Sequence, residues 1–189
     1  MKVQREVADL PFFLGENVNF LERDFQIQRL SDAFYAAYPD PPYNEILKKR
    51  TRVYNCILIQ TSYDYFICVP YRTEISHAYA YHFKNSKRSK LHHSGLDYTK
   101  IVIIKNLNYI NSEPVVIDQD EYKETVRNIE KIKREALAFV EDYTAHIEGK
   151  KMLHPREFQR RYSFSPLKYF HQELGLAPTH FSTLTNQNK

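Results

Sequence analysis

The stretch PYRTEISH at residues 70–77 holds the side chains best suited to chemistry in this chain. It follows the apolar run YFICV and brings Arg72, Thr73, Ser76 and His77 close together in sequence. RNA cleavage without a metal needs a base for the 2′-hydroxyl, donors for the phosphate oxygens and an acid for the leaving oxygen. Guanidinium, hydroxyl and imidazole groups meet these needs. The four residues are therefore catalytic candidates, and the alternative is a solvated polar turn.

A strongly basic segment follows, from Lys84 to Lys105. It carries six basic residues and one acidic residue, a local charge of +5 against a net charge of +4 for the whole chain. Clustered positive charge favours a phosphate backbone, because each neutralised phosphate releases counterions. The alternative is an ordinary solvated loop. The residues that we predict to bind RNA here are Lys84, Lys87, Arg88, Lys90, Lys100 and Tyr98.

Tyr98 is included because the chain has 15 tyrosines and no tryptophan. Several of these tyrosines lie in or beside the polar region, where their rings can stack on unpaired bases. They are Tyr43, Tyr71, Tyr79, Tyr81 and Tyr98. For each ring taken singly, packing in the core is the competing interpretation.

Patterns typical of cofactor enzymes do not occur in the sequence. It contains no glycine-rich phosphate loop, nucleophile elbow or paired-cysteine metal motif, and His92-His93 lacks zinc-protease spacing. We expect no cofactor and no metal, although the histidine pair remains a possible partial metal site. Cys56 and Cys68 lie in apolar runs, as buried thiols do. We expect a cytoplasmic protein without disulfides, signal peptide or membrane segment.

The elements that must position these residues begin with strands. The runs VYNCILIQ and DYFICVP predict an antiparallel hairpin, with further strands at 100–104 and 115–117. Residues 25–38 predict a short strand followed by a helix capped by Ser31 or Asp32. The polar stretch between Pro70 and Lys100 is predicted to be a long connection.

Helical periodicity dominates the second half of the chain. Apolar residues recur every three or four positions from Asp118 onward, which predicts one long helix near 119–148 with Gly149 beyond its end. A compact helix is predicted from the Ser165 cap to Gly175. The resulting class is α+β, a small twisted sheet or partly closed barrel with packed helices.

Length and composition favour one domain with appendages. The chain has 189 residues, 42% of them hydrophobic, which is enough for a single core. We expect an accessory arm at 1–24, the main domain at 25–176 and a tail at 177–189.

A series of segments resembles the TenpIN-type toxins of type III toxin–antitoxin systems. The matching segments are VPYRTEISH, KNSKRSK, SGLDYTKIVIIKNLNYI, VIDQDEY, LHPREF and SPLKYFHQELG, within residues 25–176. The resemblance implies an endoribonuclease with an SH3-like fold related to the Kid and MazF toxins. It also implies metal-independent cleavage that leaves a 2′,3′-cyclic phosphate, inhibition by a small repeat-derived structured RNA, and a role in phage abortive infection or plasmid maintenance.

The resemblance also implies site residues. In the related ToxN branch the corresponding strand ends in Pro-Leu-Thr-Ser-Pro-Lys, and Arg72 and Thr73 occupy the Thr-Ser positions. Ile75 stands in place of the lysine, so Arg72, His77 or a loop lysine would supply the lost positive charge.

Two more catalytic positions follow from the same branch, which uses a tyrosine before the first hairpin and a lysine at its entry. Tyr43 in DPPYNE and Arg52 in TRVYN match these places, and Lys100 aligns with a strand behind the site.

Two other function classes compete with the toxin. A non-catalytic RNA-binding regulatory module would retain RNA with salt-sensitive affinity and never cut it. An unrelated interaction domain would show no salt-dependent RNA affinity at all. The expected partners of the toxin are its antitoxin RNA and cellular or phage RNA substrates, in a hetero-oligomer of toxin and RNA.

Overall fold

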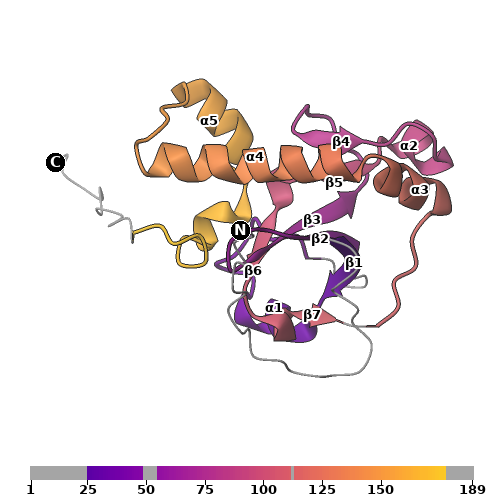
Figure 1. Ribbon diagram of the computed structural model, residues 1–189, viewed down its shortest axis with the longest axis horizontal. Helices are drawn as coiled ribbons and strands as arrows, with labels where there is room; N and C mark the ends of the chain where they lie inside the picture. The colour runs from indigo at the N-terminus through magenta and orange to yellow at the C-terminus, as the bar shows by residue number, and fades with distance from the viewer. Residues whose placement is uncertain (1–24, 49–54, 112, 178–189) are drawn as a thin grey trace, which may run out of the picture.

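The computed structural model describes residues 25–48, 55–111 and 113–177. An antiparallel sheet forms one layer, and the long helix α4 (Ile129–Ile147) crosses over it (Figure 1). The strand order is β4-β5-β3-β2-β1-β7, with β6 also paired to β3. This open sheet confirms the α+β class and does not close into a barrel.

The first strand and helix agree with the sequence prediction. Strand β1 (Phe25–Leu30) pairs with β2, and helix α1 (Asp32–Ala37) follows it directly. The Ser31 hydroxyl accepts a hydrogen bond from the Phe34 amide at 3.3 Å, as an N-cap residue does. Phe34 is fully buried, so this short helix is anchored in the core.

The predicted hairpin is the centre of the sheet. Strands β2 (Asn55–Gln60) and β3 (Phe66–Arg72) are antiparallel, with Ile57 opposite Val69. Both strands are buried on both faces because helices and loops cover the sheet, which explains their continuous apolar sequence.

Strand β3 changes partner along its length. Its first part, Phe66–Cys68, pairs with β6 (Val102–Ile104), and its end, Tyr71–Arg72, pairs with β5 (Gly95–Asp97). Pro70 lies between the two pairings, where a residue without an N–H group interrupts neither ladder. Because of this change of partner, Arg72 lies at the end of β3, where the strand leaves the core and meets the polar region.

The polar stretch after β3 is ordered, contrary to the prediction of a long connection. It contains β4 (Ala80–His82), α2 (Lys87–His92), β5 and the 3₁₀ turn η1 (Tyr98–Lys100). Gly95 permits the close pairing of β4 and β5, since a Cβ atom there would lie 2.3 Å from the Tyr81 carbonyl oxygen. Buried carboxylates, described below, hold this segment in place.

The prediction of one helix over 119–148 was wrong in one respect. Helix α3 (Gln119–Arg127) ends at Asn128, where α4 begins. The Asn128 side chain donates to the Glu124 carbonyl oxygen at 2.8 Å and so competes with the helical backbone. The Asp118 cap and the positive φ of Gly149 agree with the prediction.

Other boundaries also differ from the prediction. Residues 115–117 form no strand, and the last strand of the sheet is β7 (Ile110–Asn111), after the turn η2 (Leu107–Tyr109). The compact helix predicted at 165–175 is only a 3₁₀ turn, η3 (Pro166–Tyr169), capped by Ser165 as expected.

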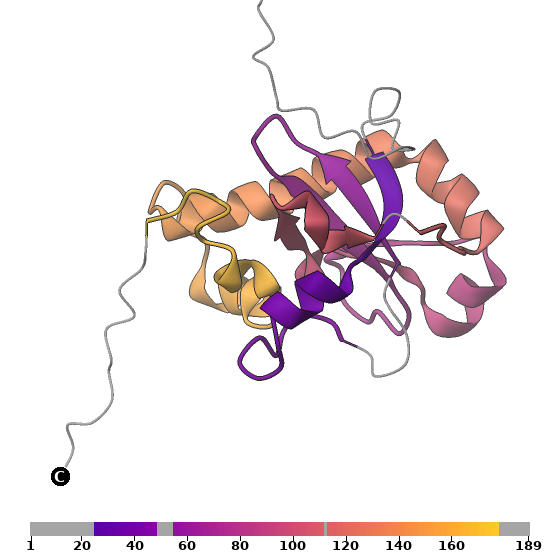
Figure 2. The ribbon, with the colours of Figure 1, turned by 90° about the horizontal axis from the view of Figure 1, so that it is seen from below.

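Helix α5 (Pro155–Tyr162) packs beside the end of α4 (Figure 2). In the described ranges, none of the helices has the length and apolar character needed to span a bilayer. The expected arm at 1–24 and nearly all of the expected tail lie outside the described residues.

Candidate active site

The candidate active site is organised around the buried carboxylate of Asp97. Arg72 Nη1 donates to Asp97 Oδ2. The other oxygen, Oδ1, accepts from the Thr99 amide at 2.9 Å and the Thr99 hydroxyl at 2.6 Å. His77 Nε2 lies 3.5 Å from the same oxygen. One carboxylate thus collects a guanidinium, a hydroxyl and an imidazole.

Local structure explains why these groups meet. Arg72 ends β3 and pairs with Gly95, while Asp97 ends β5 and caps the turn η1. Asp97 has no exposed surface, and a buried charge is tolerated only when it is paired and hydrogen-bonded. Arg72 supplies the opposite charge and Thr99 the hydrogen bonds. The cluster is therefore held together, because an unpaired Asp97 carboxylate would destabilise the fold.

His77 is the titratable member of the cluster with access to solvent. Its side chain is 33% exposed, although Nδ1 is buried and has no hydrogen-bond partner in the described part of the chain. The His77 carbonyl oxygen contacts His82 Nε2 at 2.8 Å, which ties the loop back on itself. An imidazole beside a carboxylate is an arrangement suited to proton transfer.

Lys100 links this cluster to a second group of residues, which consists of Tyr43, Glu45, Lys168 and Tyr169. Its Nζ donates to the carbonyl oxygens of Phe164 at 2.6 Å and Glu45 at 3.3 Å. Burial lowers the pKa of the Lys100 ammonium below its ordinary value; the charge of Asp97 opposes this effect and that of Arg72 adds to it. Lys100 therefore lies near the cluster as a half-buried, partly desolvated cation.

Tyr43 belongs to this second group and not to the Asp97 cluster. Its ring packs 5.1 Å from Tyr38 and 5.0 Å from Tyr169. Burial alone would raise the pKa of nearby Glu45, but hydrogen bonds from Lys168 and Tyr169 lower it below its ordinary value. Tyr43 is connected to the cluster only indirectly: it packs on Tyr169, Tyr169 bonds to Glu45, and the Glu45 carbonyl oxygen accepts from Lys100.

The hydroxyl candidates flank a tight turn. Thr73 is half-buried and Ser76 is exposed, and neither side chain hydrogen-bonds to any described residue. Between them Glu74 adopts a φ of +57°, and its amide donates to the His92 carbonyl oxygen at 2.6 Å. Both hydroxyls are therefore left available, while the backbone between them is held.

The predicted RNA-binding residues fall into two groups. Arg88 pairs with buried Glu121 at 3.1 Å, Lys100 is engaged as described, and Tyr98 is buried and donates to Glu135 at 2.9 Å. These three hold the fold, and the burial of Tyr98 leaves no ring face for a base. The exposed members are Lys84, Lys87 and Lys90.

The remaining candidates from the sequence are Arg52 and the His92-His93 pair. Arg52 lies outside the described residues. His92 Nδ1 lies 3.1 Å from Glu74 Oε1, and His93 is exposed with a φ of +45°. Within the ranges that the structure describes, His, Cys, Asp and Glu side chains form no group of three that could hold a metal ion.

Sequence reasoning missed Asp97 as a site residue. The available signal was its position as the single acid in a strongly basic segment. Glu121 and Glu124 lie within the predicted helix over 119–148, and both carboxylates are buried and bind the 84–94 segment. Comparisons with protein-family models, curated proteins and solved structures found no match.

Proposed function

We propose that this protein is a metal-independent endoribonuclease toxin of the TenpIN type, inhibited by a small repeat-derived RNA. The observation that carries the proposal is the His77–Asp97–Arg72 cluster at the end of β3. The proposal includes the SH3-like relationship, a cytoplasmic location and a role in phage abortive infection or plasmid maintenance. These come from the sequence resemblance.

The proposed reaction is an in-line attack within the RNA. The 2′-oxygen loses its proton to His77 and bonds to phosphorus, and the bond from phosphorus to the 5′-oxygen breaks. The leaving 5′-oxygen takes up a proton from water, His77 returns its proton to the solvent, and the product carries a 2′,3′-cyclic phosphate. Arg72, Thr73 and Ser76 donate to the phosphate oxygens, where negative charge develops.

Asp97 acts in this scheme as a positioning residue. It fixes the Arg72 guanidinium and lies 3.5 Å from His77 Nε2, where it orients the imidazole ring. Lys100 adds positive charge behind the cluster.

The test is cleavage of a labelled oligoribonucleotide by the full chain, stripped of bound RNA with high salt and assayed with EDTA. We expect cleavage products with cyclic-phosphate ends, and none from an oligonucleotide with 2′-deoxy sugars. His77→Gln should lower the rate by about 10²-fold or more. His93→Asn is the matched control, since His93 is an exposed loop histidine and asparagine tolerates its positive φ.

A second candidate function is a non-catalytic RNA-binding module. It is favoured by Lys84, Lys87 and Lys90, whose side chains are exposed and form no ion pair with any described residue. Salt-sensitive RNA retention without any cleavage by the stripped protein would support this candidate and exclude the enzyme.

A further inference from the structure

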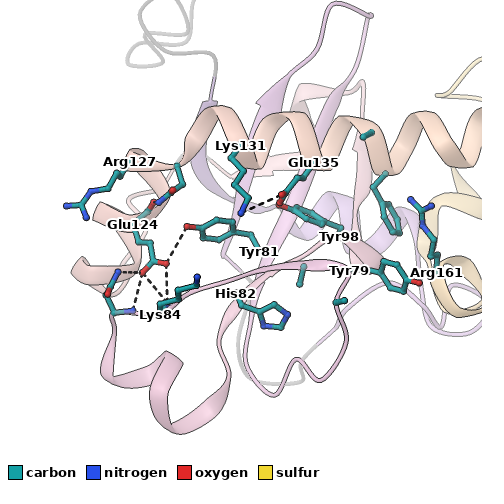
Figure 3. Close-up of a pocket in the computed structure, with 16 residues that line it drawn as sticks. Tyr79, Tyr81, His82, Lys84, Tyr98, Glu124, Arg127, Lys131, Glu135 and Arg161 are labelled. Atoms are coloured by element: carbon teal, nitrogen blue, oxygen red, sulfur yellow. Dashed lines mark hydrogen bonds and ion pairs between the residues drawn. The ribbon is translucent and has the colours of Figure 1, made fainter.

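A groove of about 680 Å³, shown in Figure 3, lies between β4 and the start of α4. It adjoins the candidate active site, because its lining includes Ala78 and Tyr98, the chain neighbours of His77 and Asp97. Its volume is in the range of binding sites for small ligands or chain segments. Residues from β4, α3, α4 and α5 line it, so its walls come from segments far apart in sequence. Its charged and aromatic lining includes Lys84, Arg127, Lys131, Arg161, Tyr79 and Tyr81.

The acidic residues of the groove are already engaged by the protein. Glu124 is buried and accepts from the Lys84 amide at 3.1 Å, the Asn85 side chain at 2.8 Å and the Tyr81 hydroxyl at 3.4 Å. Glu135 accepts from Tyr98 and lies 3.8 Å from Lys131. Neither carboxylate is free to attract a cationic ligand.

The basic residues are less engaged. Lys84 and Arg127 are exposed, and their side chains have no partner among the described residues. Lys131 lies over the Tyr81 ring at 5.5 Å, and Figure 3 shows it extending from α4 toward that ring. Because both carboxylates are occupied and Lys84 and Arg127 are unpaired within the described ranges, this side of the groove is complementary to a polyanion.

The far end of the groove combines a ring with a cation. The Arg161 guanidinium lies 5.6 Å from the centre of the Tyr79 ring, and Figure 3 shows the two side by side. Arg161 also pairs with Asp142 at 2.9 Å and with Glu157 at 3.4 Å, and its buried Nε has no partner in the described structure. A half-exposed tyrosine held by arginine offers a face on which a base can stack.

This end leads directly to the candidate active site. The rings of Tyr79 and His77 are 6.3 Å apart, and the Tyr79 carbonyl oxygen accepts from the Tyr98 amide at 3.2 Å. Tyr98 is the neighbour of Asp97 in the chain. A strand of RNA with its reacting phosphate at His77 would therefore continue past Tyr79 into the groove.

We infer that the groove binds a single-stranded segment of RNA, with phosphates at Lys84, Arg127 and Lys131 and a base against Tyr79. The choice of RNA over other polyanions rests on the proposed function. The inference adds residues of α3, α4 and α5 that the basic segment of the sequence does not contain. Substrate and inhibitory RNA share this chemistry, and the experiment distinguishes them.

The probe is a short, fluorescent, single-stranded oligoribonucleotide with 2′-O-methyl groups, which block cleavage. The test variant is Lys84→Gln with Arg127→Gln, and the control is Lys150→Gln with Arg156→Gln, two exposed cations outside the groove. We expect binding about tenfold weaker for the test variant. The slope of log K against log salt should fall by about 1.4, from about 0.7 per lost contact on single strands. The control should match the wild type.

Equal affinity and equal salt slope in the two double variants would overturn the inference, provided that circular dichroism shows both folded. Tight binding by the wild type without cleavage of an unmodified oligonucleotide would reject the enzyme and leave the groove standing. If the test variant loses its co-purifying RNA but cleaves at the normal rate, the groove binds the inhibitory RNA. If the test variant keeps that RNA but shows a reduced kcat/KM, the groove binds the substrate.

Discussion

Two buried carboxylates, Asp97 and Glu121, hold the polar segment to the rest of the protein in similar ways. Each has no exposed surface and pairs with one arginine; Asp97 binds one hydroxyl group and Glu121 binds two. The two arginines, Arg72 and Arg88, keep 27% and 30% of their side chains exposed. By burial and by the arginine that each one pairs with, the two clusters cannot be told apart.

The difference lies in an imidazole that only the Asp97 cluster contains. His77 lies 3.5 Å from Asp97, whereas the partners of Glu121 are Ser86, Ser94 and Arg88. An ion pair without a titratable neighbour stabilises a fold, and the same pair beside an imidazole can also direct a proton. Glu121 therefore stabilises the fold, and Asp97 is the better candidate for function.

The largest expected effect is that of Asp97→Asn. The amide keeps the shape but loses the charge that orients Arg72 and His77, and we expect cleavage to fall by about 10³-fold or more. The pH dependence of the remaining activity should also change, which a purely structural residue would not cause. Single-turnover cleavage across pH 5–9, about the range in which histidine titrates, measures both. A variant with a normal rate and pH profile would remove Asp97 from the mechanism.

Arg72→Lys should have the next largest effect. Lysine keeps the charge but cannot present the planar set of donors that serves Asp97 and a phosphate together. We expect about 10–10²-fold slower cleavage at unchanged RNA affinity. Arg88→Lys is the matched control in the Glu121 cluster, and an equal loss there would erase the distinction between the two clusters.

Glu121→Gln should affect stability and not chemistry. The amide leaves Arg88 without its charge partner and disturbs two serine hydroxyls, and we expect the free energy of unfolding to fall by about 1–3 kcal/mol. Urea denaturation measures this loss, and the cleavage rate per folded molecule should stay at the wild-type value. Slower cleavage by fully folded protein would show that the Glu121 cluster also affects the site.

The smallest effect concerns a polar contact outside both clusters. The Tyr143 hydroxyl lies 2.7 Å from His171 Nε2, and burial lowers the pKa of His171 below its ordinary value of 6.5. Between the lowered pKa of the folded protein and 6.5, the unfolded chain binds more protons at His171 than the folded protein does. The free energy of unfolding should therefore fall as the pH drops below 6.5. His171→Asn should reduce the decrease in Tm between neutral and mildly acidic pH. An unchanged decrease would place its origin in other groups.

Local sequence signals predicted the parts of the fold that depend on neighbouring residues. The hairpin, the Ser31 cap and the Asp118 cap follow from apolar runs and capping residues that act over a few positions. The break at Asn128 was missed because apolar periodicity continues across it, while one side-chain hydrogen bond decides the geometry.

Long-range contacts explain what the sequence could not provide. The order of the segment between Pro70 and Lys100 depends on Glu121 and Glu124, which lie in a different helix. The segment therefore appeared as a polar connection. In the same way, PYRTEISH supplied Arg72 and His77, but their shared partner Asp97 was visible only once β5 was paired with β3.

The interruption at Asn128 separates two helices with different attachments. Glu121 and Glu124 of α3 bind the residues on either side of α2, whereas α4 packs its apolar face on the sheet. Amide protons of α2 and α3 should therefore exchange with deuterium together, as one cooperative unit, and more readily than those of α4. Because Lys84 and Arg127 belong to that unit, one wall of the groove can open while the core of the protein remains closed.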